Sequence, residues 1–138
     1  MIGIVLASHS IALANAVKEV ADLMSRGSVA ITPVGGTGDP ESPFGSNSIA
    51  IAEAIQATDS GEGVLILMDV GSSVIGVIQA LEFIPAALRD RVRLCAGPMV
   101  EGAILAAAQA ASGSDLSAVL HDATHALDVK VAQLDGFA

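Results

Sequence analysis

Aromatic and basic side chains are scarce in this sequence of 138 residues. It has no Trp or Tyr, three Phe, and six Lys and Arg against fifteen Asp and Glu, which gives a formal net charge of −9. Proteins that bind nucleic acids without sequence preference need clustered cations to neutralise phosphates and often use aromatic rings to stack on bases. The composition therefore argues against nucleic-acid binding and against attraction to an anionic membrane surface, and it favours a basic protein partner.

Cysteine and long hydrophobic runs are also lacking. Cys95 is the only cysteine, so an internal disulfide and a zinc site built from several thiolates are excluded, as suits a reducing compartment. No apolar run approaches the roughly 18–20 residues that span a bilayer, and no basic leader precedes the first apolar run at residues 2–7. We therefore expect a cytoplasmic protein, without membrane insertion, that folds as a single domain over residues 1–138.

Short apolar runs alternate with stretches of helical periodicity along the chain. Residues 2–7, 28–34, 64–68 and 91–96 predict four strands, and the segments between them predict helices. The two most apolar runs, the first and the third, are typical of strands buried on both faces and are placed in the centre of the sheet. Right-handed crossovers then predict a three-layer α/β/α fold with an open, mostly parallel sheet and the strand order 2-1-3-4.

Helix faces and boundaries can also be predicted. Pro33 cannot donate to a strand ladder, so its strand is expected at the sheet edge, and Ser48 is expected to cap the helix after the loop at residues 35–47. The first helix, which ends near Gly27, is expected to bury Leu13, Val17, Val20 and Met24. The last helix is expected to bury Leu116, Val119, Leu120, Ala123 and Leu127.

His9 and Asp69 follow the two strands that are predicted to lie in the centre of the sheet. The winding reverses between these strands, and the crevice at their carboxyl ends is the usual ligand site of an open α/β sheet. The helix N-terminus after His9 favours a phosphoryl group and disfavours an imidazolium, so the ring is expected to be a neutral nucleophile. Asp69 is expected to accept a hydrogen bond from one ring nitrogen and so orient the other.

An acidic domain must offset the charge of a phosphoryl group locally, and backbone amides and hydroxyls can do so. The phosphate-binding residues predicted near the crevice are Ser10, Gly35, Gly36, Ser72 and Ser73. Only two lysines occur, Lys18 and Lys130, both on predicted helices away from the strand ends, and no glycine-rich loop has the Walker pattern. We therefore expect that the chain does not take phosphate directly from ATP.

Other reactive side chains are assigned structural roles. His121 and His125 are four residues apart, as two metal ligands on one helix face would be, but we interpret them as part of a solvated face and predict no metal site. Cys95 is expected to be a buried, unreactive thiol. The basic cluster near the fourth strand is interpreted as charge balance at the sheet edge: Arg89, Arg91 and Arg93.

Four segments together resemble a known family over essentially the whole chain. They are IVLASHS at residues 4–10, the two glycines at 35–36, MDVGSS at 68–73 and GPMVEGAILAAAQAASG at 97–113. At this spacing they resemble the mannose-type IIA phosphocarrier domains of the bacterial phosphotransferase system (PTS). The glycine that comes two residues after Asp69 makes the chain most similar to the members that serve the PEP-dependent dihydroxyacetone kinase.

The resemblance implies a phosphoryl relay through a phosphohistidine at His9. The histidine phosphocarrier protein HPr would be the donor, and the acceptor would be ADP on the nucleotide-binding subunit of the kinase, which also has a dihydroxyacetone-binding subunit. Asp69 matches the family position that hydrogen-bonds the active histidine. The resemblance also implies a homodimer and no cofactor bound by this chain. Larger members append further phosphocarrier domains, so we expect a separate protein as donor; residues 45–47 depart from the family's Gly-Thr-Ser and are assigned no role.

Three alternatives remain. The chain could be the IIA component of a mannose-type sugar transporter, which differs only in the acceptor, or a non-enzymatic regulatory module that binds a partner or small anion in the same crevice. An aspartyl-phosphate receiver domain is less favoured, because it needs acidic residues at the end of the first strand to hold magnesium, and residues 8–10 offer none. The nearly all-apolar helix at residues 74–83 is predicted to be partly covered by a partner subunit.

Overall fold

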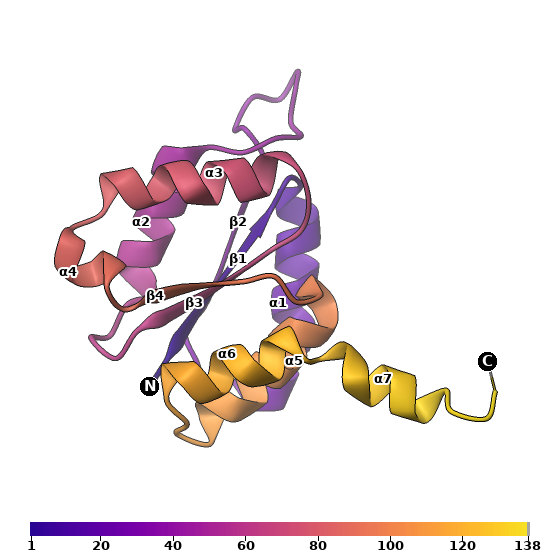
Figure 1. The fold of residues 1–138 in the computed structure, drawn as a ribbon. Helices are drawn as coiled ribbons and strands as arrows, with labels where there is room; N and C mark the ends of the chain where they lie inside the picture. Colours follow the sequence, from indigo (N-terminus) through magenta and orange to yellow (C-terminus); the bar gives the residue numbers. More distant parts are fainter. Residues whose placement is uncertain (138) are drawn as a thin grey trace.

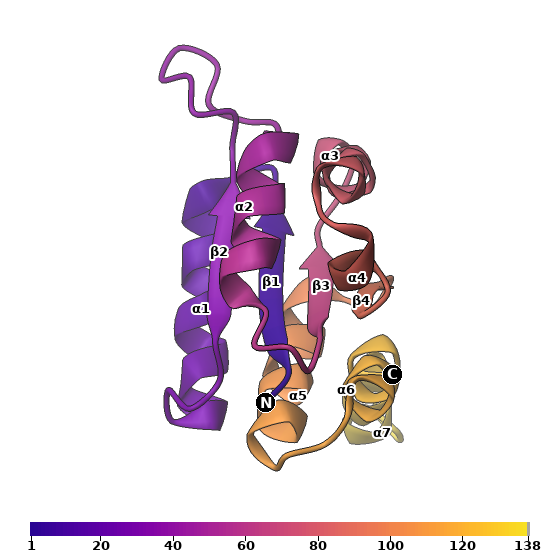
Figure 2. The same ribbon diagram turned by 90° about the vertical axis from the view of Figure 1, so that its left-hand side faces the viewer.

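A four-stranded parallel sheet forms the centre of the computed structural model, which describes residues 1–137. Its strands are β1 (Gly3–Ser8), β2 (Ile31–Gly35), β3 (Val64–Met68) and β4 (Val92–Cys95), in the order β2-β1-β3-β4 (Figures 1 and 2). The predicted strand order and parallel pairing are therefore confirmed. Pro33 lies in the edge strand β2, where its missing N–H costs no ladder bond to a further strand.

Helices cover both faces of the sheet. One face packs against α2 (Ser48–Thr58), α3 (Ser72–Ala80), the 3₁₀ turn η1 (Leu81–Phe83) and α4 (Ala86–Arg89). The other packs against α1 (Ile11–Ser25), α5 (Met99–Ala111) and α6 (Leu116–Thr124). Alternate residues of β1 enter the two cores, Ile4 and Leu6 on one side and Val5 and Ala7 on the other, as expected of a strand buried on both faces.

The predicted buried face of α1 is wrong in part. Val17 is buried as predicted, but the other three members of the predicted stripe are between 39% and 48% exposed: Leu13, Val20 and Met24. The helix instead buries Ala14 and Ala21, and Ala21 packs in the same core as the alanine-rich neighbouring helix α5. Small side chains let two helices approach closely, so the packing favours the small residues of α1 over its large ones.

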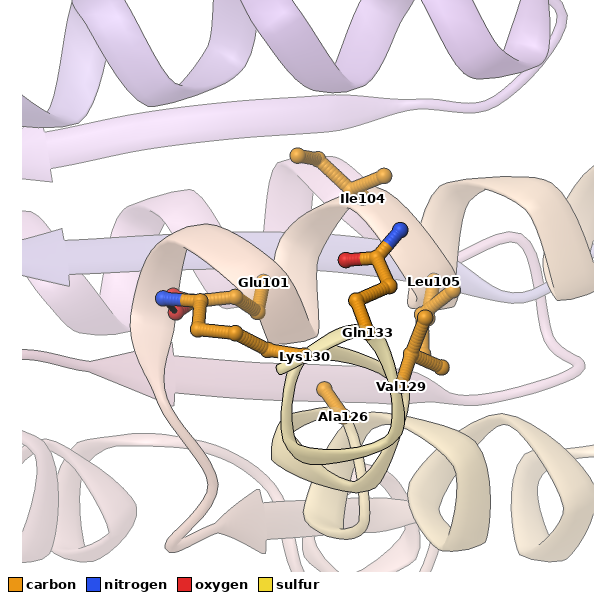
Figure 3. A pocket seen from close by; sticks show the side chains of 7 residues that line it. All are labelled: Glu101, Ile104, Leu105, Ala126, Val129, Lys130 and Gln133. Carbon is orange, nitrogen blue, oxygen red and sulfur yellow. Dashed lines mark hydrogen bonds and ion pairs between the residues drawn. The ribbon is translucent and has the colours of Figure 1, made fainter. Parts of the chain in front are cut away.

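The C-terminal region forms two helices where one was predicted. Val119 and Ala123 are buried, but α6 ends at Thr124 and α7 (Leu127–Gln133) starts a new direction, which leaves Leu127 45% exposed. Figure 1 shows α7 continuing outward from the body of the molecule. The helix α7 contacts α5 around a small pocket closed at one end by a Lys130–Glu101 ion pair, with Ile104, Leu105 and Val129 in its lining (Figure 3).

Two further details concern helix ends and membranes. The cap of α2 is Asn47 and not Ser48, because the Asn47 backbone is extended and its side chain accepts a hydrogen bond from the N–H of Ala50.

Within residues 1–137, no helix is both long and apolar enough to cross a lipid bilayer.

Candidate functional site

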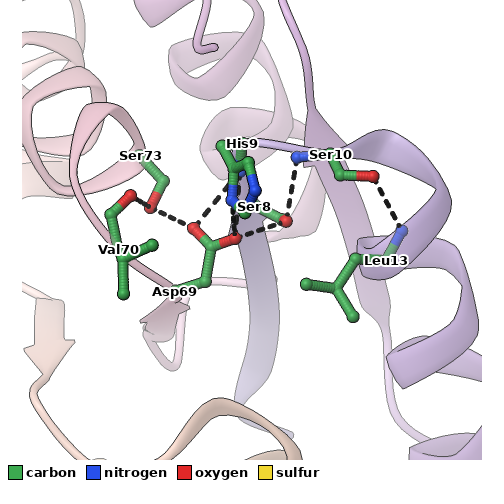
Figure 4. Close-up of polar contacts among 7 residues, drawn as sticks. All are labelled: Ser8, His9, Ser10, Leu13, Asp69, Val70 and Ser73. Carbon is green, nitrogen blue, oxygen red and sulfur yellow. Dashed lines mark hydrogen bonds and ion pairs between the residues drawn. The ribbon is translucent and has the colours of Figure 1, made fainter. Parts of the chain in front are cut away.

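His9 and Asp69 meet where the two central strands end. Residue Ala7 of β1 pairs with Met68 of β3, and the N–H of Asp69 donates to the carbonyl of Ala7 at 3.2 Å. The backbone N–H of His9 donates in return to the Asp69 carboxylate at 3.1 Å, and His9 Nδ1 lies 2.5 Å from Asp69 Oδ2 (Figure 4). The structure thus brings together the two residues that the sequence placed at this crevice.

Two buried hydroxyl groups hold the Asp69 carboxylate in place. Ser8 Oγ donates to Oδ2 at 2.7 Å, and Ser73 Oγ donates to Oδ1 at 2.5 Å. Burial by itself would raise the pKa of Asp69, but hydrogen bonds from Ser73, Ser8, the Val70 backbone and His9 outweigh it and lower the pKa to about 2. Asp69 is therefore ionised at neutral pH, and each of its carboxylate oxygens is held in place by a hydrogen bond from a serine hydroxyl.

The Asp69 carboxylate determines which nitrogen of the His9 ring carries a hydrogen. An ionised carboxylate can only accept, so Nδ1 carries a hydrogen, and in the neutral ring Nε2 then carries the free lone pair. Nε2 has no hydrogen-bond partner within residues 1–137, and the side chain is 41% exposed. His9 lines an open hollow together with Phe44, Gly45, Val70, Gly71 and Ser72. The nitrogen that can reach a ligand is Nε2.

Three of the predicted phosphate-binding residues make contacts within the fold. Ser73 is fully buried and its hydroxyl is directed to Asp69. The N–H of Gly36 donates to the Ser8 carbonyl at 3.4 Å. A Cβ atom on Gly35 would lie 2.6 Å from the Ser8 carbonyl oxygen and 3.1 Å from the N of Ile11, so glycine is needed there for the close approach of α1. These contacts position the site and the fold around it, and the phosphate-binding role of the three residues stays a prediction.

The other two predicted residues, Ser10 and Ser72, lie at helix starts beside His9. Ser10 caps α1, since its Oγ accepts from the N–H of Leu13 at 3.3 Å and keeps its own hydrogen free to donate (Figure 4). Ser72 is the first residue of α3 and lines the hollow. Gly71 precedes it with φ of 59°, a left-handed conformation that turns the chain into α3 at this point. The first-turn amides of both helices add positive partial charge near the hollow.

The sequence analysis missed several residues of the site. Ser8 could have been found, because it ends β1 directly before His9 and carries a hydroxyl group. Phe44, Gly45 and Val70 gave no comparable signal: Gly45 donates its N–H to the His9 carbonyl at 3.0 Å, and the Phe44 ring lies with its centroid 6.1 Å from that of the His9 ring. The position of Phe44 and Gly45 depends on the path of a long loop, which no periodicity encodes, and Val70 lies in the short turn between β3 and α3.

The remaining reactive side chains have local partners. The rings of His121 and His125 are 4.4 Å apart, and His125 Nδ1 donates to the His121 carbonyl at 2.8 Å. Arg91 pairs with Asp59 at 2.6 Å. Cys95 is buried as predicted, and its sulfur accepts from the N–H of Gly97. Within the described residues, no group of three or more side chains is arranged to hold a metal ion.

Comparison with known proteins places this chain in a family. The chain is 38% identical over 135 residues to the phosphoryl donor subunit DhaM of the PEP-dependent dihydroxyacetone kinase of Escherichia coli (strain K12), which is 97% of this chain but only 29% of that protein. It is 34% identical over 125 residues to the subunit DhaM of PEP-dependent dihydroxyacetone kinase 2 of Listeria innocua, covering 91% of this chain and 98% of that protein. The chain thus spans under a third of one relative and nearly all of the other.

Solved structures share the fold. A crystal structure of a protein of unknown function superposes with a TM-score of 0.75 at 30% identity, covering 90% of this chain and 93% of that one. A DegV family protein from Corynebacterium glutamicum gives a TM-score of 0.61 at 20% identity, which shows a common fold only. The family model described as the PTS system fructose IIA component matches residues 3–120. The resemblance inferred from the four sequence segments is therefore confirmed, and this chain belongs to the family of PTS IIA components.

Proposed function

We propose that this chain is the phosphoryl donor module of a PEP-dependent dihydroxyacetone kinase. His9 accepts a phosphoryl group from HPr on Nε2 and passes it to ADP on the nucleotide-binding subunit, for use on dihydroxyacetone held by a further subunit. The observation that carries this proposal is the 2.5 Å contact between His9 Nδ1 and Asp69, which leaves Nε2 as the free nucleophile. The names of the relatives support the choice of acceptor.

The transfer needs no external proton or cofactor. The Nε2 lone pair attacks the phosphorus of the donor's phosphohistidine, the donor P–N bond breaks, and its imidazole leaves with the electron pair. His9 becomes a phosphorylated imidazolium that keeps its hydrogen on Nδ1, and the Asp69 carboxylate stabilises this new positive charge. Attack by an ADP oxygen then breaks the Nε2–P bond and returns His9 to its neutral form.

The phosphoryl group also brings negative charge near the Asp69 anion. A phosphoryl group carries about −1.5 to −2 charges at neutral pH, and no lysine or arginine lines the hollow around His9. The Ser72 hydroxyl, the free hydrogen of Ser10 and the first-turn amides of α1 and α3 are the donors available to offset that charge. A site with such moderate stabilisation suits an intermediate that must be released again to the next acceptor.

The proposal also covers the protein partners, the cellular compartment and the oligomeric state of the chain. HPr, the nucleotide-binding subunit and the dihydroxyacetone-binding subunit are the expected partners, in the cytoplasm, and the chain is expected to form a homodimer. Three apolar side chains on α3 and η1 are more than half exposed, which supports a protein partner on that helix: Ile75, Ile78 and Phe83.

The family match also supports a second candidate function. A IIA component of a sugar transporter uses the same phosphohistidine chemistry and differs in the acceptor, and the matched family is described as a PTS IIA component. The two candidates therefore make the same prediction for the charging of His9 and opposite predictions for its discharge.

The test is a two-step labelling experiment. Phosphoenolpyruvate, enzyme I and HPr are expected to add one phosphoryl group to the wild type, with an acid-labile and base-stable linkage, and none to His9→Ala. His121→Ala serves as the matched control, because His121 is exposed on α6 and pairs only locally. Chase with the ADP-loaded kinase subunit is expected to discharge the label. Labelling of His9→Ala would refute the assignment of the nucleophile, and a label that survives the chase would refute the kinase as acceptor.

A further inference from the structure

The loop at residues 36–47 is held in place beside His9, although its middle projects from the body of the molecule (Figure 1). The N–H of Gly45 donates to the carbonyl of His9 at 3.0 Å. The N–H of Thr37 donates to the carbonyl of Pro43 at 3.1 Å, which ties the two arms of the loop together. Phe44 lies between these two hydrogen-bonded points, so its backbone position is fixed from both sides.

A second contact fastens the end of the loop to α3. The side chain of Ser46 packs against Gly76, where an added Cβ atom would lie 2.5 Å from Ser46 Oγ. No side chain larger than that of glycine fits at position 76 without displacing the loop. The end of the loop is therefore held between the start of α1 and the middle of α3, with Phe44 above the hollow.

The side chains that flank the hollow are apolar and exposed. Phe44 is 69% exposed and Val70 is 65% exposed, and both line the hollow that contains His9. No Lys, Arg, Asp or Glu side chain lines the hollow. Since the Phe44 and His9 ring centroids are 6.1 Å apart, any protein that brings a phosphoryl group to Nε2 must come within reach of the Phe44 ring.

We propose that Phe44 and Val70 form a docking rim for the phosphorylated protein that charges His9, and that this partner surrounds its own phosphohistidine with apolar side chains. This inference rests on the proposed function and adds how the partner is recognised. Preordered aromatic residues at the centre of an interface contribute most of its binding energy, and their burial keeps water away from the groups between them. At this rim, exclusion of water also protects the phosphoryl group from hydrolysis while it passes between two imidazoles.

The test compares two alanine variants with alanine variants at two other exposed apolar positions as controls. Phe44→Ala and Val70→Ala are paired with Phe137→Ala and Val131→Ala, which remove side chains that are 88% and 66% exposed near the C-terminus. The measurement is the second-order rate constant for phosphoryl transfer from phosphorylated HPr, in rapid-quench experiments. Phe44→Ala is expected to lose about tenfold or more, Val70→Ala about threefold, and both controls less than about twofold.

A small donor separates docking from chemistry at His9. Phosphoramidate transfers its phosphoryl group to histidine with release of ammonia and makes no protein interface. The loss of rate in Phe44→Ala and Val70→Ala, relative to their controls, is expected to be larger with HPr than with phosphoramidate. If Phe44→Ala matches its control with HPr, the docking rim is refuted while the proposed function stands. If Phe44→Ala loses as much rate with phosphoramidate as with HPr, Phe44 acts on His9 itself and the docking role is refuted. If the wild type accepts no phosphoryl group from HPr, the proposed function fails first.

Discussion

Replacing Asp69 by Asn tests the electrostatic part of the site with little change of shape. The Asn oxygen can face His9 Nδ1, and its NH₂ group then faces Ser73. The Ser73 hydroxyl has an alternative acceptor in the Val70 carbonyl at 3.1 Å, so it can turn and accept a hydrogen bond from Asn. The variant is therefore expected to fold and to keep the His9 tautomer, while the negative charge is lost.

The magnitude follows from the strength of a hydrogen bond to a charged group. In the proposed reaction, phosphorylation of His9 creates a positive ring against a carboxylate whose side chain is 10% exposed. Charge-assisted hydrogen bonds contribute about 1.5–3 kcal/mol, so Asp69→Asn is expected to slow phosphorylation about 10- to 100-fold. Phosphoramidate is the preferred phosphoryl donor for this measurement, because it makes no protein interface. The rate of His9 phosphorylation then depends on the reactivity of the ring and not on docking of a protein partner.

Asp59→Asn is the matched control. The Asp59 side chain is also 10% exposed and pairs with Arg91 at 2.6 Å, and that hydrogen bond lowers its pKa in spite of burial. This variant is expected to lose stability and to keep the wild-type phosphorylation rate. A wild-type rate for Asp69→Asn, or an equal loss in both variants, would show that the Asp69 charge does not stabilise the phosphorylated ring.

Two further predictions concern stability. The pKa of Asp69 is about 2 in the folded chain against 3.8 for an ordinary Asp, so its ionisation stabilises the fold by about 2–3 kcal/mol above pH 3.8, and this contribution disappears as the pH falls toward 2. Urea unfolding between pH 6 and pH 2 should therefore show that the difference in unfolding free energy between the wild type and Asp69→Asn becomes smaller as the pH falls. A difference that does not change with pH would contradict the lowered pKa of Asp69. Gly35→Ala places a Cβ 2.6 Å from the Ser8 carbonyl oxygen and is expected to lower the unfolding free energy by about 1–3 kcal/mol. An unchanged denaturation midpoint would contradict the close approach of the Gly35 backbone to Ser8.

The parts of the fold that could be predicted are those that short-range hydrophobic patterns in the sequence determine. Residues 2–7 and 64–68 are apolar on both faces, which places them in the centre of the sheet, and parallel neighbours end at the same edge. The meeting of His9 and Asp69 follows from that step alone. The sequence therefore predicted the central pair without any knowledge of the loops.

The parts that could not be predicted depend on close packing. Whether α1 buries its large or its small residues is decided by the alanine-rich surface of α5, which lies far away in sequence. Ser72 and Ser73 are adjacent, yet one lines the hollow and the other is buried against Asp69, because the start of α3 fixes which side each one faces. The position of Phe44 needs the contacts of Gly45 and Ser46, which join segments that no periodic pattern connects.

The bond from the His9 N–H to the Asp69 carboxylate has a dynamic consequence. It follows the last backbone bond between β1 and β3, from the Asp69 N–H to the Ala7 carbonyl, so a side chain extends the ladder of the central strands by one step. The ring and its carboxylate can therefore separate by a backbone motion only when those strands begin to part, which is among the rarest openings of a folded domain. His9 and Asp69 are thus assembled before any partner binds, and in the proposed reaction each encounter needs to organise only the phosphoryl group.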